Sequence, residues 1–186
     1  MLAYSLSYGL GKQEKSLWLR LLGLANNVID QLYFPLEHIA WAADAKLINI
    51  SSARWWVLCI AAWALSLTLN ILRCLTLIAG VRKARRQLKL ENQTDEPSTK
   101  LSSTEECTSG ERQRLQQLHQ LQQAERTQVL ELVKSAADLC NAVHWLPAGF
   151  LWAGRLSDTA VGFFGTISSV LRLRSVLLQA QARLSV

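Results

Sequence analysis

The hydrophobic pattern divides this chain into long apolar blocks separated by polar stretches. The clearest block runs from residue 55 to residue 81, and few polar positions interrupt it: Ser66, Thr68, Asn70, Arg73 and Thr76. A helix over this block rises about 40 Å, which exceeds the ~30 Å hydrocarbon core of a bilayer. The sequence therefore predicts a transmembrane helix over residues 55–81.

Both ends of this block carry residues that are typical of a membrane interface. Trp55 and Trp56 open it, and indole rings favour the boundary between lipid and water. A basic cluster follows it directly, composed of Arg82, Lys83, Arg85 and Arg86. We predict that the two tryptophans and this cluster anchor the helix at the two interfaces.

The region before the block, residues 1–54, shows the periodicity of amphipathic helices. Apolar side chains recur there at three- and four-residue steps, namely Leu17, Leu21, Leu24, Val28 and Leu32. Polar residues such as Asn26 and Asp30 fall elsewhere on the helical wheel. A second helix is expected to follow Pro35. The pattern fits two arrangements equally, a soluble helical hairpin and helices packed on a membrane surface.

The next two segments differ in their polarity pattern. Residues 82–110 are first basic and then rich in Ser, Thr, Glu, Asp and Asn, which predicts a flexible connector. Residues 111–145 return to helical periodicity, interrupted at Glu125. They are predicted to form an amphipathic helix that lies on a surface or binds a partner, because no heptad repeat persists as a coiled coil would require.

The last apolar block, residues 146–171, is weakly hydrophobic because Arg155 and Asp158 interrupt it. Its continuous apolar run from residue 159 is about 20 Å long as a helix, which is short for a span. The two charges are three residues apart and can pair on a helix, which lowers the cost of burial. We predict a second membrane segment here, with a re-entrant or interfacial hairpin as the alternative, followed by a tail over residues 172–186.

Together these segments predict an all-α, helical integral membrane protein with amphipathic helices and one to two transmembrane segments. Small residues that allow close helix approach are predicted to mediate helix packing or oligomer contacts: Ala62, Ser66, Gly162, Gly165 and Ser169. The intramembrane polar residues are Asn70, Arg73, Arg155 and Asp158. Arg73 is expected either to extend toward the basic end of its helix or to contact another helix.

Composition and charge narrow the class of partner. The 186 residues are 50% hydrophobic, and the mean hydropathy of +0.13 lies between soluble and polytopic membrane proteins. The net charge of +6 comes from Lys and Arg that are scattered or stand beside the apolar blocks. This distribution suits anionic lipid headgroups and predicts no nucleic-acid partner, since no recognition motif accompanies it.

The sequence carries no strong signature of catalysis or metal binding. It has no P-loop, no dinucleotide glycine fingerprint, no H-E-x-x-H and no nucleophile elbow. Cys140 and His144 are four residues apart, but a zinc site needs three or four ligands. We therefore predict no catalytic residue, no cofactor and no metal, and a protein that is not an enzyme.

Several long, tryptophan-rich segments carry a family resemblance. They are Tyr8–Gly11 (YGLG), Asp30–Ala45 (DQLYFPLEHIAWAADA), Ser52–Trp56 (SARWW), Trp63–Leu67 (WALSL), Asn141–Arg155 (NAVHWLPAGFLWAGR) and Val161–Val170 (VGFFGTISSV). In order and spacing these segments resemble the peroxin-11 family, and most closely its gamma type. The resemblance begins at Tyr8, and the upstream helices of the family have no counterpart, so the chain resembles an N-terminally shortened form.

The resemblance implies a multi-pass protein of the peroxisomal membrane that promotes or regulates elongation and fission of peroxisomes. Members remodel membranes through amphipathic helices, form homo-oligomers and hetero-oligomers with sibling forms, and work with a fission adaptor and a dynamin-like GTPase. Membrane anchoring is expected to survive in a shortened form, and retention of remodelling is a question for experiment. The alternative function is an oligomeric solute channel lined by the intramembrane polar residues.

Two lines of reasoning disagree on topology. Basic residues are denser after the first span than before it, and the positive-inside rule then places the connector in the cytosol. The family arrangement puts both termini in the cytosol and the connector in the matrix. Our expectation follows the family. A third possibility, a helical adaptor of the secretory membranes, rests on the glycosylation acceptor sequence at residues 92–94.

Overall fold

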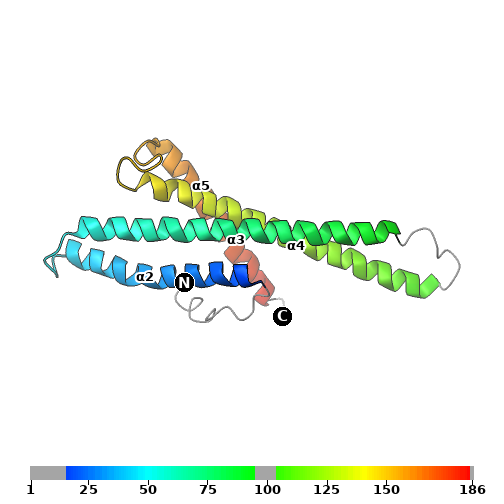
Figure 1. The fold of residues 1–186 in the computed structure, drawn as a ribbon. Coiled ribbons are helices and arrows are strands. Elements are labelled where there is room, and N and C mark those ends of the chain that lie inside the picture. Colours follow the sequence, from blue (N-terminus) through cyan, green and yellow to red (C-terminus); the bar gives the residue numbers. More distant parts are fainter. Residues whose placement is uncertain (1–15, 95–103, 185–186) are drawn as a thin grey trace. The chain divides into compact units, whose positions relative to one another are not determined.

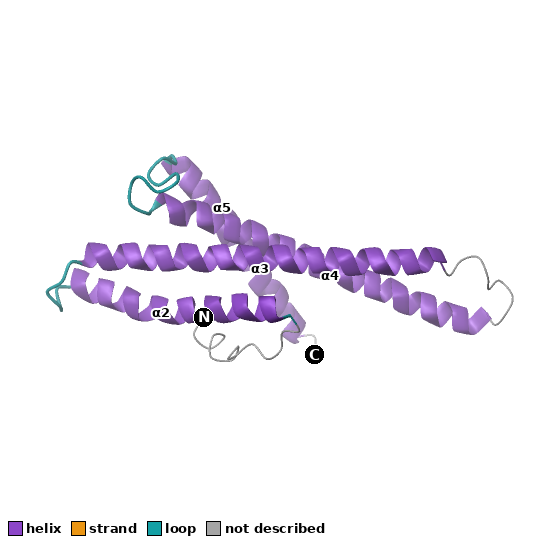
Figure 2. Ribbon diagram, viewed as in Figure 1, coloured by secondary structure: helices purple, strands orange, loops and turns teal. Residues whose placement is uncertain are grey.

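The computed structural model describes residues 16–94 and 104–184. These residues form the helices α2 (Leu17–Asp44), α3 (Ser52–Thr94), α4 (Thr104–His144) and α5 (Asp158–Leu184), and the described part holds no strand (Figures 1 and 2). Contacts divide the chain into two units, Met1–Arg73 with Glu131–Val186 and, separately, Cys74–Leu130. The prediction of an all-α protein is confirmed.

Helix α2 is a single helix, so the predicted start of a second helix after Pro35 was wrong. Pro35 lies inside α2 and removes only the one hydrogen bond that its nitrogen cannot donate. Ala40 and Ala43 are buried, and their packing stabilises the helical turns that follow Pro35. The helix ends at Asp44, and the left-handed residue Lys46 (φ 57°) follows it, where the N–H of Leu47 donates to the carbonyl of Ala42 at 2.9 Å.

Helix α3 is longer than the predicted span. Its 43 residues rise about 65 Å, roughly twice the hydrocarbon thickness of a bilayer. The segment predicted as a connector, residues 82–110, is therefore helical up to Thr94 and again from Thr104, and residues 95–103 lie outside the described part. Good helix formers such as Ala84, Gln87 and Leu88 continue an existing helix at little cost, and polarity alone does not end one.

The predicted membrane segment over residues 146–171 is divided by the structure. Residues 145–157 form successive turns, with φ of 104° at Gly149 and 70° at Gly154 and with Leu151 also left-handed at 46°. Glycine tolerates such angles, and Pro147 does not favour a continuing helix. Helix α5 then starts at Asp158 and runs to Leu184, so the predicted tail from residue 172 is largely helical.

Two helices among the described residues are long and apolar enough to cross a membrane, Ser52–Leu90 and Asp158–Leu178. In each helix, only 6% of the most apolar stretch is buried against the rest of the chain. A core helix of a soluble protein would have its apolar side chains covered by neighbouring elements. These helices instead present their apolar surface outward, as a lipid-facing helix does.

Helices α2 and α3 pack antiparallel in the first unit (Figure 1). Near the turn between them, the indole Nε1 of Trp56 donates to Asp44 Oδ2 at 2.6 Å. Farther from the turn, Ser66 Oγ donates to Asp30 Oδ1 at 2.9 Å. The two helices therefore run in opposite directions.

The last part of α4 also runs antiparallel to α3. The rings of Trp63 and Trp145 have centroids 6.1 Å apart, and Asn70 Nδ2 donates to Ser135 Oγ at 2.8 Å. These contacts bring the start of α3 and the end of α4 to the same end of the unit.

Helix α5 in turn runs antiparallel to α4. Asn141 Nδ2 donates to the carbonyl of Val161 at 3.3 Å, and Arg172 Nη2 lies 3.7 Å from Asp138 Oδ2. Residue numbers thus fall along α4 as they rise along α5, and α5 crosses α4 obliquely (Figure 1).

Candidate functional site: a polar cluster among apolar helices

The polarity of the first unit is inverted relative to a soluble bundle. The predicted apolar face of α2 points outward, with Leu17 74%, Leu21 52%, Val28 51% and Leu32 55% exposed. Leu24 is half-buried on the same helix. Polar side chains of α2 instead point at neighbouring helices. An apolar exterior around a polar interior is what a lipid environment favours, because lipid offers polar groups no hydrogen-bond partner.

The inward polar residues of α2 bond to α3. Asn26 Nδ2 donates to Asp30 Oδ2 at 3.1 Å, and Ser66 Oγ lies 2.9 Å from both Asn26 Oδ1 and Asp30 Oδ1. The Ser66 hydroxyl therefore shares one proton between two acceptors. Sequence spacing paired Ser66 with Ala62 as a small-residue contact, but the contact that Ser66 makes is a polar one.

A second group of polar residues comes from α4 and α5. The hydroxyl of Ser135, which is 1% exposed, accepts a hydrogen bond from Asn70. Lys134 pairs with Glu131 one turn before it. Asp138, 8% exposed, has Arg172 as its counter-ion. The charges in this part of α4 are therefore paired, as buried charges must be.

These groups surround a cavity of about 540 Å³. Its lining combines aromatic and small apolar residues with both signs of charge; the polar side chains are Asn26, Asp30, Tyr33, Ser66, Asn70, Lys134, Ser135, Asp138 and Arg172. The Oδ2 atom of Asp138 is buried there and accepts no hydrogen bond from the described residues. A polar solute or ordered water can be accommodated at this position.

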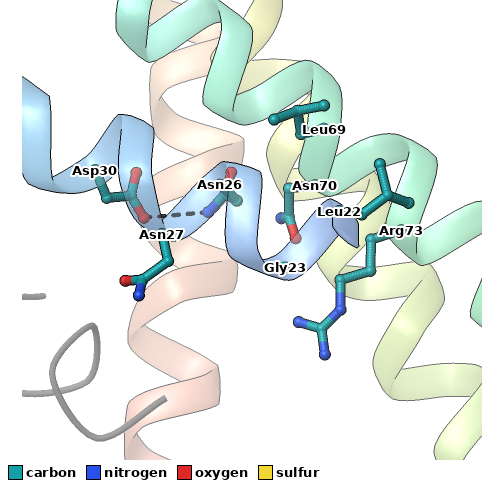
Figure 3. A pocket seen from close by; sticks show the side chains of 8 residues that line it. All are labelled: Leu22, Gly23, Asn26, Asn27, Asp30, Leu69, Asn70 and Arg73. Carbon is teal, nitrogen blue, oxygen red and sulfur yellow. Dashed lines mark hydrogen bonds between the residues drawn. The ribbon is translucent and has the colours of Figure 1, made fainter. Parts of the chain in front are cut away.

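Arg73 lies at a neighbouring pocket, as Figure 3 shows. The pocket is small, about 40 Å³, and Asn26, Asp30 and Asn70 line it together with Arg73. Arg73 thus shares a pocket with polar residues of α2, and both arrangements expected for it stay predictions.

We expect the Asn70 to Ser135 hydrogen bond to stabilise the bundle measurably. Asn70→Leu should lower the free energy of unfolding by about 1–2 kcal/mol, because it leaves the Ser135 hydroxyl buried without its donor. A double-mutant cycle with Ser135→Ala in detergent micelles measures the coupling. Additive single effects would contradict a direct bond.

The small residues of α5 differ in what they contact. A Cβ built on Gly165 would lie 3.5 Å from Asn141 Nδ2, so α5 approaches α4 closely at this residue. A Cβ built on Gly162 would meet no neighbouring element within 4 Å, and Ser169 is exposed. The residue buried in this turn is Ser168, at 4% exposure. Gly162 and Ser169 therefore remain candidates for contacts outside the chain.

Arg155 and Asp158 do not share a helix, contrary to what their spacing suggested. Arg155 is exposed in the turns before α5, and Asp158 stands exposed in its first turn. Asn70 and Arg73 lie instead on α3, where they line the polar cavity and its neighbour. The four residues expected to line a channel thus do not form one group within this chain.

The basic cluster is partly neutralised within the second unit. Arg82 Nε lies 2.7 Å and Arg85 Nη1 3.4 Å from the carboxylate of Glu125. The hydrogen bond from Arg82 is the main reason why the pKa of Glu125 lies below its usual value. Glu125, which interrupts the apolar periodicity of α4, is thus the partner of these arginines, while Lys83 and Arg86 stay exposed.

The two tryptophans at the start of α3 are both half-buried. The hydrogen bond of Trp56 to Asp44 links the ends of α2 and α3. Hydrogen bonds from Ser52 and then Trp56 lower the pKa of Asp44, so this carboxylate stays ionised at neutral pH.

Sequence reasoning missed the α4 part of the cluster: Ser135, Asp138 and Asn141 are all buried. Their spacing of three residues places them on one face of a helix, and this was the available signal. The described residues hold no group of three or more His, Cys, Asp or Glu side chains arranged to bind a metal.

An all-helical chain with two exposed apolar spans and a polar interior defines a helical membrane protein. Over residues 1–177 the chain matches the family described as Peroxisomal biogenesis factor 11 (PEX11), and it belongs to this family.

Two curated relatives are similar over most of the chain. Human Peroxisomal membrane protein 11C is 41% identical over 173 residues, which cover 93% of this chain and 65% of the relative. The mouse protein of the same name is 42% identical over 171 residues, which cover 92% and 64%. The chain thus spans a little less than two thirds of the length of these relatives. No solved structure matches it.

Proposed function

We propose that this chain is a peroxisomal membrane protein that promotes or regulates elongation and fission of peroxisomes. The observation that carries the proposal is family membership over residues 1–177, and the relatives named above are peroxisomal membrane proteins. The two exposed apolar spans support a location in the membrane.

The outward apolar face of α2 suggests how the chain acts on lipid. Leu17, Leu21, Val28 and Leu32 offer an apolar stripe that lipid chains can cover. Self-association would concentrate such helices and expand the membrane locally. The open surface at Gly162 and Ser169 is a candidate for contact with a second copy or a sibling form.

The remaining parts of the proposal follow the family resemblance. The chain would be multi-pass with both termini in the cytosol, where a fission adaptor and a dynamin-like GTPase can reach it. Its direct partners would be peroxisomal lipid, further copies and sibling forms, with no nucleic acid and no cofactor.

Imaging of cells that express the full chain tests this function. With an N-terminal tag beside a peroxisomal marker, we expect co-localisation and longer or more numerous peroxisomes than in vector controls. The double variant Leu21→Glu/Val28→Glu should keep its location, because both spans are intact, and should lose the change in peroxisome shape, because charge on the stripe opposes lipid contact.

The matched control is Leu21→Met/Val28→Ile, which keeps the stripe apolar and should act as the parent chain does. Unchanged peroxisomes with the parent chain would contradict the proposed activity, and exclusion from peroxisomes would contradict the proposed location.

A further inference from the structure

An aromatic pocket lies between α2, the first turns of α3 and the residue that follows α4. Its volume is about 230 Å³. The lining residues all belong to the first unit: Tyr33, Trp56, Cys59, Ile60, Trp63 and Trp145. Aromatic side chains from three separate parts of the chain thus form most of its wall.

The rings give this wall the electrostatic character that attracts a cation. Trp63 and Trp145 have centroids 6.1 Å apart and ring planes inclined by 31°, so the two indoles are closer to stacked than to edge-on. The faces of indole and phenol rings carry negative potential and attract positive charge. The hydroxyl of Tyr33 donates to Glu37 Oε1 at 3.2 Å, which makes the ring of Tyr33 still richer in electrons.

Carboxylates stand beside the pocket, and no lysine or arginine is among the described residues that line it. Glu37 bonds Tyr33 and also interacts electrostatically with Cys59, a second lining residue. Asp44 accepts the hydrogen bond of the Trp56 indole at 2.6 Å. The local charge therefore favours a cationic ligand over a neutral or anionic one.

The hydrogen-bonding capacity of the wall selects among cations. No side chain among the described lining residues is a carboxylate or an amide, and indole nitrogens donate but do not accept. A primary ammonium has three donors that need acceptors when it leaves water. A quaternary ammonium has no N–H group, and aromatic cages bind it through its methyl surface, as they bind choline.

We propose that this pocket binds the quaternary ammonium group of a choline lipid. Its volume is below the ~300–1,000 Å³ of sites for drug-sized ligands, so it suits a headgroup and not a whole lipid. Trp145 is 52% exposed and leaves one wall accessible. The pocket lies at the start of the candidate span Ser52–Leu90, where exposed Val57 and Leu58 offer apolar surface to acyl chains.

Lipid binding is measured on the full chain, purified in dodecyl maltoside, which contains no choline. Phosphatidylcholine and phosphatidylethanolamine with identical short acyl chains are titrated separately, and native mass spectrometry counts the bound lipid. We expect phosphatidylcholine to bind about tenfold more tightly, because the wall leaves the primary ammonium without acceptors. Equal affinity for the two lipids would overturn the proposal. Free phosphocholine should bind more weakly than the lipid, and equal affinity would overturn the choice of a lipid over a soluble choline compound.

Substitutions test whether the aromatic pocket is the site. Trp145→Leu removes one exposed ring and should weaken phosphatidylcholine binding about tenfold, whereas Trp145→Phe keeps an aromatic face and should retain most of the affinity. The matched control is Trp41→Leu, which removes a tryptophan that is 60% exposed and does not line the pocket. It should bind as the parent chain does.

Unchanged affinity in Trp145→Leu, or an equal loss in Trp41→Leu, would overturn the assignment to this pocket. The inference concerns one lipid headgroup and does not rest on the action on peroxisomes proposed above. The lipid count does not depend on peroxisome shape, so failure of this inference is distinct from failure of the proposed function.

Discussion

Replacement of Gly165 by leucine is expected to separate α5 from α4 and to lower the free energy of unfolding by about 1–3 kcal/mol. A Cβ at this position already lies 3.5 Å from Asn141 Nδ2, so the further three carbons of leucine have no room. Displacement of α5 would also break the hydrogen bond from Asn141 to the carbonyl of Val161. Chemical unfolding of the protein in micelles, followed by circular dichroism, measures the loss.

Gly162→Leu is the matched control, because the same substitution there, less than one turn away, meets nothing within 4 Å. Its unfolding midpoint should stay near that of the parent chain, and the added leucine slightly raises helix propensity. Equal destabilisation by both variants would mean that the added apolar side chain itself, and not contact with α4, sets the effect.

The second large effect is expected from loss of the counter-ion of Asp138. Arg172→Leu leaves a carboxylate that is only 8% exposed without its cation. Removal of one partner from a fully buried pair costs about 3–5 kcal/mol. The side chain of Arg172 is 56% exposed, and solvent screening reduces the expected loss to about 1–3 kcal/mol.

Two comparisons isolate the charge effect. Arg174→Leu removes an exposed arginine two residues away and should have little influence on unfolding. Addition of Asp138→Asn to Arg172→Leu should restore most of the stability, because the neutral amide carries no uncompensated charge. If the double variant is no more stable than the single one, packing by the arginine stem explains the loss.

Local signals in the sequence predicted the parts of the fold that depend on local chemistry. The apolar run from Trp55 and the basic residues after it gave the position of α3. The spacing of Leu17, Leu21 and Val28 gave the helix and the apolar face of α2. Such signals depend on residues within one or two helical turns, and the structure has helices where they predict them.

Other predictions failed because a local signal was given more weight than helix continuation. Pro35 lacks one donor but fits inside a long helix whose later turns are packed. The polar residues after Val81 continue α3 because they are good helix formers. Arg155 stands in a turn because Gly149 and Gly154 adopt angles that a helix does not contain.

The candidate site was beyond local reasoning because its residues come from distant parts of the chain. Asn70 bonds Ser135, 65 residues away, and Ser66 bonds Asp30, 36 residues away. Each polar residue alone is compatible with solvent exposure. Only the packing of the helices shows that Ser135 and Asp138 face inward.

The buried polar face of α4 has a consequence for biogenesis. Each polar group of Ser135, Asp138 and Asn141 would meet hydrocarbon if this helix entered a bilayer alone, at a cost of several kcal/mol per group. Their partners lie on α3 and α5, and α5 is synthesised last. Insertion of helices one at a time, in order of synthesis, is therefore unfavourable. These polar groups therefore have to form their interhelical contacts before or while α4 enters an apolar environment.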